Sequence, residues 1–153
     1  MKKWVGILAG CCLWPAVAAA EARAVFSGEE SLQRTLTRIA DGARASIDLA
    51  VYQVSSAPLL RALRRAEERR VSVRILIDGG PRSSPDPAAL DLFPGRLRLV
   101  RPRRGQGAMH HKFVVFDGAT VVTGSYNWTP GAEHVNEENL VILDDPAVVS
   151  GFE

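Results

Sequence analysis

The stretch Met109-His110-His111-Lys112-Phe113-Val114-Val115-Phe116-Asp117-Gly118 decides how this 153-residue chain folds. Its centre, residues 113–116, is apolar at every position, which is typical of a strand buried on both faces. Asp117-Gly118 is a pair that favours a tight turn, and the β-branched residues at 120–123 predict a return strand. The segment therefore predicts an antiparallel hairpin whose first strand is buried.

The alternation of side chains along a strand sorts the polar residues at the start of this hairpin. Successive side chains point to opposite faces, so His110 and Lys112 share one side and His111 takes the other. We therefore expect His111 to pack against the protein rather than to act in a site. A zinc site is not expected, because adjacent histidines on opposite faces cannot converge on one ion and lysine is a poor ligand.

Closing the hairpin brings further polar side chains to His110 and Lys112. If residues 118–119 form the loop, Lys112 faces Ser125 and His110 faces Asn127. A different loop register shifts the pairing only slightly, so the four residues still meet at the open end. An imidazole can attack phosphorus or move a proton, while ammonium and amide groups bind phosphate oxygens. This set favours chemistry on a phosphoryl group.

Outside the hairpin, strand-like and helix-like segments alternate, which indicates an α/β fold. We predict a single domain over residues 23–153, with a mixed β-sheet flanked by helices on both faces. The first helix is expected to open at Ser27 and Glu30, which form a capping box. The other expected elements are strands at 24–26, 46–54, 71–77 and 96–100, a helix that starts near Pro58, and a short helix at 88–93.

The first 22 residues have the pattern of a secretory signal peptide. The basic start, Met1-Lys2-Lys3, precedes an almost wholly apolar run that ends at Ala20, so cleavage is expected after Ala20 or Ala22. We therefore expect a periplasmic or secreted protein. Two alternatives would anchor it to a membrane: retention of the segment, or a lipid on Cys11, where the sequence resembles a bacterial lipoprotein box. Both cysteines lie in this segment, so the predicted domain has none.

Basic residues gather just before and within the hairpin. Between residues 82 and 112 there are seven basic residues against two acidic ones. Such a surplus is consistent either with a solvated loop or with a rim that attracts a phosphate-bearing substrate. The basic residues are Arg82, Arg96, Arg98, Arg101, Arg103, Arg104 and Lys112.

The spacing His110-x-Lys112-x4-Asp117, followed after six residues by Gly124-Ser125-x-Asn127, resembles the catalytic motif of the phospholipase D superfamily. Downstream, residues 136–139 resemble the N-x-E-N element of the same superfamily. The resemblance extends over nearly all of the predicted domain and implies a phospholipase D-like fold with one motif per chain.

The resemblance also implies roles for individual residues. His110 would be the nucleophile and form a phosphohistidine intermediate, Lys112 and Asn127 would bind the phosphate, and Ser125 would add a donor. Glu138 would orient His110 through its second ring nitrogen. Asp117 lies in the turn, so the hairpin itself predicts that it supports the site without touching substrate. No metal or cofactor is implied.

The superfamily mechanism uses two histidines, and this chain has one motif. The resemblance therefore implies a homodimer with one composite active site, as in a short bacterial endonuclease of this superfamily. We expect a metal-independent phosphodiesterase, first of all a non-specific endonuclease acting on DNA or RNA. The alternative substrate is a phospholipid, cleaved as by a phospholipase D to release phosphatidic acid. A non-catalytic nucleic-acid-binding module is a third, less favoured reading.

Overall fold

The computed structural model describes residues 21–81, 85–102 and 107–153. All but the last two residues of the predicted signal peptide lie outside these ranges, as do Arg82, Arg103 and Arg104 of the basic segment. Within the described ranges, no helix is long and apolar enough to cross a membrane. The elements follow in the order β1 (Ala22–Phe26), α1 (Leu32–Gly42), β2 (Ser46–Val51), α2 (Ala57–Glu68), β3 (Ser72–Asp78), α3 (Pro87–Leu92), β4 (Leu97–Val100), β5 (Lys112–Phe116), β6 (Thr120–Gly124), α4 (Pro130–His134), β7 (Asn139–Leu143) and α5 (Pro146–Ser150).

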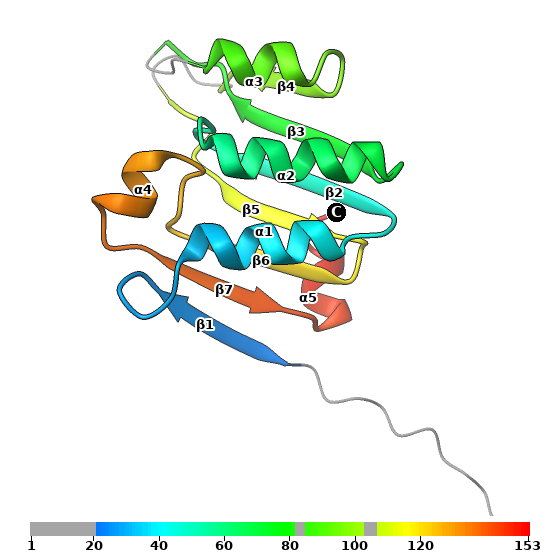
Figure 1. The fold of residues 1–153 in the computed structure, drawn as a ribbon, viewed down its shortest axis with the longest axis vertical. Coiled ribbons are helices and arrows are strands. Elements are labelled where there is room, and N and C mark those ends of the chain that lie inside the picture. The colour runs from blue at the N-terminus through cyan, green and yellow to red at the C-terminus, as the bar shows by residue number, and fades with distance from the viewer. Residues whose placement is uncertain (1–20, 82–84, 103–106) are drawn as a thin grey trace, which may run out of the picture.

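Seven strands form one mixed sheet in the order β1-β7-β6-β5-β2-β3-β4 (Figure 1). β2, β3 and β4 run parallel, because α2 and α3 carry the chain back along the sheet between them. The other neighbouring strands are antiparallel, and the β5–β6 connection is the tight turn that the sequence predicts. The predicted α/β fold with a mixed sheet is confirmed.

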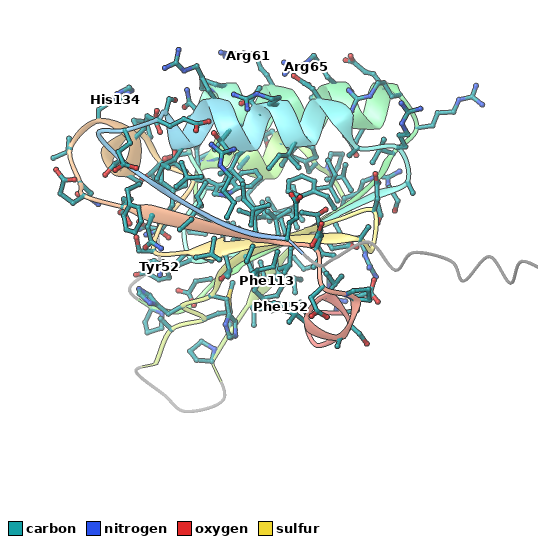
Figure 2. The ribbon with its side chains drawn as sticks, turned by 90° about the horizontal axis from the view of Figure 1, so that it is seen from below. Tyr52, Arg61, Arg65, Phe113, His134 and Phe152 are labelled. Atoms are coloured by element: carbon teal, nitrogen blue, oxygen red, sulfur yellow. The ribbon has the colours of Figure 1, made fainter. Side chains whose placement is uncertain are left out.

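The main hydrophobic core lies between the sheet and helices α1 and α2, which cover one face together (Figure 2). The alternation along β3 shows why: Val73, Ile75 and Ile77 point to the helices and are buried, whereas Arg74 and Leu76 point to the other face and are exposed. The helices supply an apolar stripe that includes Leu32, Leu36, Leu59 and Leu63.

The opposite face of the sheet is covered only in part. Val149 of α5 packs against Val115 and belongs to a second, smaller apolar cluster. Phe152 packs edge-on against Phe113, with 5.0 Å between ring centroids, and Figure 2 shows both rings on the same side of the sheet as α5. Toward β3, however, Leu76 remains 39% exposed beside a groove of about 700 Å³. Helices therefore flank both faces, as predicted, but cover the second one incompletely.

Helix α1 starts later than predicted. Ser31, not Ser27, caps it, since its Oγ accepts the backbone N–H of Arg34 at 3.1 Å. Ser27 instead accepts the backbone N–H of Glu138 at 2.8 Å. The capping-box prediction was wrong because a contact with a residue far along the chain occupies this serine, and local spacing cannot reveal such a contact.

The β5–β6 hairpin differs by one residue from the register favoured above. Its loop is residues 117–119, with positive φ at Asp117 (56°) and Gly118 (60°), and Phe116 pairs with Thr120. This register places Lys112 across from Gly124 rather than from Ser125. The expected site residues nevertheless remain at the open end of the hairpin.

Candidate active site

The predicted site residues gather at one end of the sheet. Val51, the last residue of β2, pairs with Lys112 at the start of β5. Gly124, the last residue of β6, pairs with Leu140 near the start of β7. Because these neighbours are antiparallel, strand ends and strand starts alternate along one edge. The remaining site residues stand just outside the strands at this edge: His110, Ser125, Asn127 and Glu138.

His110 and Lys112 lie against each other on one side of the chain, as the alternation predicts. Lys112 Nζ is 2.9 Å from Nδ1 and 3.1 Å from Nε2 of His110, and it donates to the His110 carbonyl at 3.1 Å. Partial burial holds the pKa of the Lys112 ammonium below its ordinary value, and the nearby Glu138 carboxylate opposes this shift. An ammonium beside an exposed imidazole can bind an anion where the imidazole attacks or moves a proton.

Tyr52, directly after β2, forms a wall of the site. Its ring centroid is 4.7 Å from that of His110, with the planes tilted by 50°, and Lys112 Nζ lies 5.4 Å from the same centroid. The backbone N–H of Tyr52 donates to the carbonyl of His111 at 2.8 Å. Figure 2 shows Tyr52 at the opposite end of the sheet from α5. The ring therefore contacts both residues of the candidate nucleophile–cation pair.

Glu138 lies between α4 and β7, and its carboxylate is held by neighbours. Ser125 Oγ donates to one oxygen, and Nδ2 of Asn136 donates to the other at 2.9 Å. In this single chain one Glu138 oxygen thus accepts from Ser125 and the other from Asn136, whereas the resemblance implies a hydrogen bond to His110. The carboxylate is still close enough to raise the pKa of Lys112.

The backbone at position 124, directly before Ser125, has room for glycine only. Its φ is 149°, and a Cβ atom here would lie 2.2 Å from the backbone oxygen of Asn139. Only glycine lets β6 approach the next strand this closely. The Asn139 carbonyl then accepts the N–H of Ser125 at 3.2 Å, and Ser125 Oγ accepts the N–H of Asn139 at 3.1 Å. The close approach therefore fixes Ser125 in place.

Asn127 presents an amide with an unmet hydrogen-bonding need. Its Oδ1 is buried and has no hydrogen-bond partner among the residues that the structure describes. Buried polar atoms are normally paired, so a water molecule, an ion or a ligand would have to supply the missing partner. Since the oxygen and nitrogen of an amide are told apart by their partners, a phosphate oxygen at this place would select the flipped amide, with its NH₂ group donating.

Asp117 lies at the other end of β5 from His110 and Lys112. Its carboxylate accepts the backbone N–H groups of Arg44, Ala45 and Ser46 at 2.7 to 3.1 Å. Burial raises the pKa of Asp117. The N–H donors lower it by more than burial raises it, so the pKa lies below its ordinary value. Asp117 therefore ties the hairpin turn to the start of β2.

Asp78 lies at the same edge of the sheet. Like Tyr52, it is not among the site residues predicted from the sequence. It ends β3 and is 1% exposed; its Oδ1 accepts the N–H of Met109 at 2.8 Å and its Oδ2 accepts that of Gly80 at 3.2 Å. Met109 directly precedes His110. A sequence signal for both residues existed, because the carboxyl ends of neighbouring parallel strands meet at one edge of a sheet, where side chains of sites gather.

His111 lies apart from the pair, as predicted. Its ring meets that of Phe113 edge-on, with 5.9 Å between centroids, and so belongs to the α5 side of the sheet. Over the described ranges, no group of three or more histidine, cysteine, aspartate or glutamate side chains could hold a metal ion.

The basic segment reaches the site only in part. Arg96 forms an ion pair with Glu67 at 3.1 Å, and both Arg96 and Arg98 line the groove on the α5 side of the sheet. Arg101 follows the carboxyl end of β4, which runs parallel to β3, and is therefore at the end of the sheet where Asp78 and His110 lie. Of the described arginines in this segment, Arg101 is the one placed to meet a substrate at this edge.

Comparison with known proteins gives a consistent result. A family model described as "Cardiolipin synthase, PLD-like domain" matches residues 36–153. Mitochondrial cardiolipin hydrolase of Xenopus laevis is 39% identical over 112 residues, which are 73% of this chain and 53% of that protein. The human protein of the same name is 38% identical over 130 residues, 82% of this chain and 49% of that one. The chain thus spans about half the length of the curated relatives it matches.

Two solved structures share the fold over a greater fraction of their length. Nuc from Salmonella typhimurium, a phospholipase D family member, superposes with a TM-score of 0.73 and 27% identity, over 88% of this chain and 90% of that one. NucT from Helicobacter pylori superposes with a TM-score of 0.74 at 20% identity, over 88% of this chain and 91% of that one, and shows likeness of fold alone.

Proposed function

Because the chain belongs to the family of PLD-like domains, we propose that it hydrolyses phosphodiester bonds with His110 as the nucleophile. The observation that carries this proposal is the pair at the start of β5, where the Lys112 ammonium lies 2.9 Å from the exposed His110 imidazole. Lys112 would bind the oxygens of the phosphate while His110 attacks phosphorus. The amide of Asn127 would supply a further donor. The Ser125 hydroxyl, which donates to the Glu138 carboxylate in the single chain, would add another by turning toward the phosphate.

The proposed reaction has two displacement steps. In the first, a ring nitrogen of His110 forms a bond to phosphorus and the bond from phosphorus to the leaving oxygen breaks, while a second imidazole gives that oxygen its proton. In the second, the same imidazole takes a proton from water, the water oxygen attacks phosphorus, and the bond to His110 breaks. The products are an alcohol and a phosphomonoester, and no step draws on a metal ion or cofactor.

The second imidazole is proposed to come from another copy of the chain. His111 packs on Phe113 on the other side of the sheet and therefore does not share the site with His110. A homodimer with a two-fold axis at the site edge would bring two copies of His110 to one phosphate. Sedimentation of the active enzyme tests this proposal: full activity in a species that sediments as a monomer would exclude the composite site.

Nucleic acid is our first proposal for the substrate, as in a non-specific endonuclease for DNA or RNA. It is supported by the basic surplus of residues 82–112 and by the position of Arg101 at the site edge. A phospholipid is the second proposal, in which the protein would act as a phospholipase D. The name of the relatives at 38–39% identity, mitochondrial cardiolipin hydrolase, supports it.

One experiment separates these proposals. The purified chain and its His110→Ala variant are incubated with plasmid DNA, with single-stranded RNA and with cardiolipin vesicles, each in excess EDTA. Cleavage of nucleic acid alone supports the nuclease, and release of phosphatidic acid alone supports the lipid enzyme. Quenching in alkali, where phosphohistidine survives, should trap labelled phosphate on the wild type and none on His110→Ala. Equal activity of both proteins would rule out His110 as the nucleophile.

A further inference from the structure

We propose that Asp78 is a positioning residue for His110 and acts through the backbone of Met109. The inference rests on the proposed role of His110 as the nucleophile, and it adds a residue that lies outside the motif formed by residues 110–127. It starts from one fact about the fold: His110 does not lie in a strand. β5 begins at Lys112, so the sheet ladder does not fix the backbone that carries the imidazole.

Lys112 donates to the His110 carbonyl, and two further hydrogen bonds, from the ends of other strands, hold this backbone on each side of His110. Before it, the N–H of Met109 donates to Asp78 Oδ1 at 2.8 Å. After it, the carbonyl of His111 accepts the N–H of Tyr52 at 2.8 Å. The ring of Tyr52 also lies against the imidazole, with 4.7 Å between centroids. The segment that carries His110 is therefore fixed from the ends of β2 and β3, two strands that come earlier in the chain.

The bond from Asp78 is the unusual one, because it crosses the sheet. In the strand order, β2 lies between β3 and β5. Tyr52, at the end of β2, contacts an immediate neighbour, whereas Asp78, at the end of β3, reaches past β2 to Met109. A side chain is needed for this reach, since the backbone of β3 pairs with β2 and β4.

The burial of Asp78 argues that its carboxylate is kept for a purpose. The side chain is 1% exposed, and burial of a carboxylate is costly unless hydrogen bonds compensate for the lost water. Its two oxygens accept the N–H groups of Met109 and Gly80. A charged acceptor forms shorter and stronger hydrogen bonds than a neutral one, which suits a contact that must hold a nucleophile at a defined distance from phosphorus.

Such a role has a kinetic signature. Misplacement of a nucleophile by about 1 Å lowers the rate of the chemical step by about 100-fold, while groups that bind the substrate elsewhere are unaffected. Loss of the Asp78 contact should therefore lower kcat and leave KM nearly unchanged. If the carboxylate only stabilised the fold, its removal would lower the melting temperature without a selective loss of kcat.

The test compares Asp78→Ala and Asp78→Asn with Asp145→Ala, which removes another carboxylate that accepts backbone N–H groups, at the start of α5 and outside the site. We expect kcat of Asp78→Ala to fall about 100-fold with KM within about twofold of wild type. Asp78→Asn keeps an acceptor oxygen for Met109 and should recover at least about a tenth of the wild-type kcat. Asp145→Ala should keep the wild-type kcat.

A measurement on the wild-type protein tests the contact even if Asp78→Ala does not fold. The amide of Met109, although outside any strand, should exchange with solvent slowly by NMR, and faster in Asp78→Asn. Rapid exchange in the wild type, wild-type kcat in Asp78→Ala, or an equal loss of kcat in Asp145→Ala would each overturn the inference. Activity that survives His110→Ala would instead overturn the proposed function, so the two failures are distinct.

Discussion

The two ends of strand β5 carry charged side chains in opposite situations. At the turn end, three backbone N–H groups surround the Asp117 carboxylate and hold its pKa below the ordinary value, so the fold stabilises the charge. At the other end, partial burial holds the pKa of the Lys112 ammonium below its ordinary value, so the fold opposes the charge. One strand thus has an end that contributes to stability and an end whose charge lacks full compensation.

The difference indicates what the second end is for. A cation whose charged form is disfavoured by its surroundings gains from an anion. Asn127, at the same end of the sheet, has a buried amide oxygen that also lacks a partner in the described structure. A bound phosphate would compensate the ammonium and satisfy the flipped amide together. Changes at the two ends should therefore separate activity from stability.

The largest expected effect is at the site end. Lys112→Met keeps the length and the buried stem of the side chain but removes the charge that would stabilise the phosphate during attack. We expect kcat/KM to fall by about 10²- to 10³-fold, the usual loss for one electrostatic donor to a transition state. The melting temperature, followed by circular dichroism, should not fall. A marked loss of stability in this variant would remove the contrast between the two ends.

The turn end should behave in the opposite way. Asp117→Asn replaces a charged acceptor of three N–H groups by a neutral amide, and hydrogen bonds to charged groups are the stronger ones. We expect the free energy of unfolding to fall by about 2 kcal/mol and kcat/KM to stay within about twofold of wild type. Urea denaturation measures the free energy of unfolding, and initial rates measure kcat/KM. A large loss of activity in a fully folded sample would contradict the conclusion that Asp117 serves stability.

Acid should remove the stabilisation at the turn end. Because the folded protein lowers the pKa of Asp117, this carboxylate stabilises the fold fully at pH values above its ordinary pKa of 3.8. The contribution is lost as the pH falls through the lower pKa of the folded state. The difference in unfolding free energy between wild type and Asp117→Asn should thus be constant near neutral pH and shrink below about pH 4. A difference that grows on acidification would contradict the sign of this shift.

The smallest effect is a shift in a pH profile at the site end. The Glu138 carboxylate raises the pKa of Lys112 and partly offsets the effect of burial. In Glu138→Gln this opposing influence is gone, so the Lys112 pKa should fall further and the alkaline decline of kcat/KM should begin at lower pH. The profile of Glu138→Asp, which keeps the charge, serves as the control. A shift of the alkaline limb to higher pH would show that another group titrates there.

Sequence reasoning identified the α/β fold, the hairpin and the set of residues at its open end, because local spacing encodes all three. Val114 and Phe116 are buried on the helix side as an apolar strand predicts, and His111 lies on the far side from His110 as the alternation of a strand requires. The turn at Asp117-Gly118 was also identifiable, although its loop is one residue longer than favoured.

The parts that could not be predicted depend on contacts between distant segments. The bond from Ser27 to Glu138 joins residues 111 positions apart and displaces the start of α1 to Ser31. The contact of Asp78 with Met109 needs the strand order, in which β2 separates β3 from β5. The resemblance likewise implies His110 as the partner of the Glu138 carboxylate, whereas in the single chain Ser125 and Asn136 donate to it.

The incomplete cover on the second face of the sheet has a practical consequence for measurements of stability. Fluorescent dyes such as ANS become bright on exposed apolar surface. The groove of about 700 Å³ beside Leu76 and Phe113 offers such a surface in the native protein. We expect a high dye signal before heating and only a small rise on unfolding, so a dye-based thermal shift would understate how well this protein is folded.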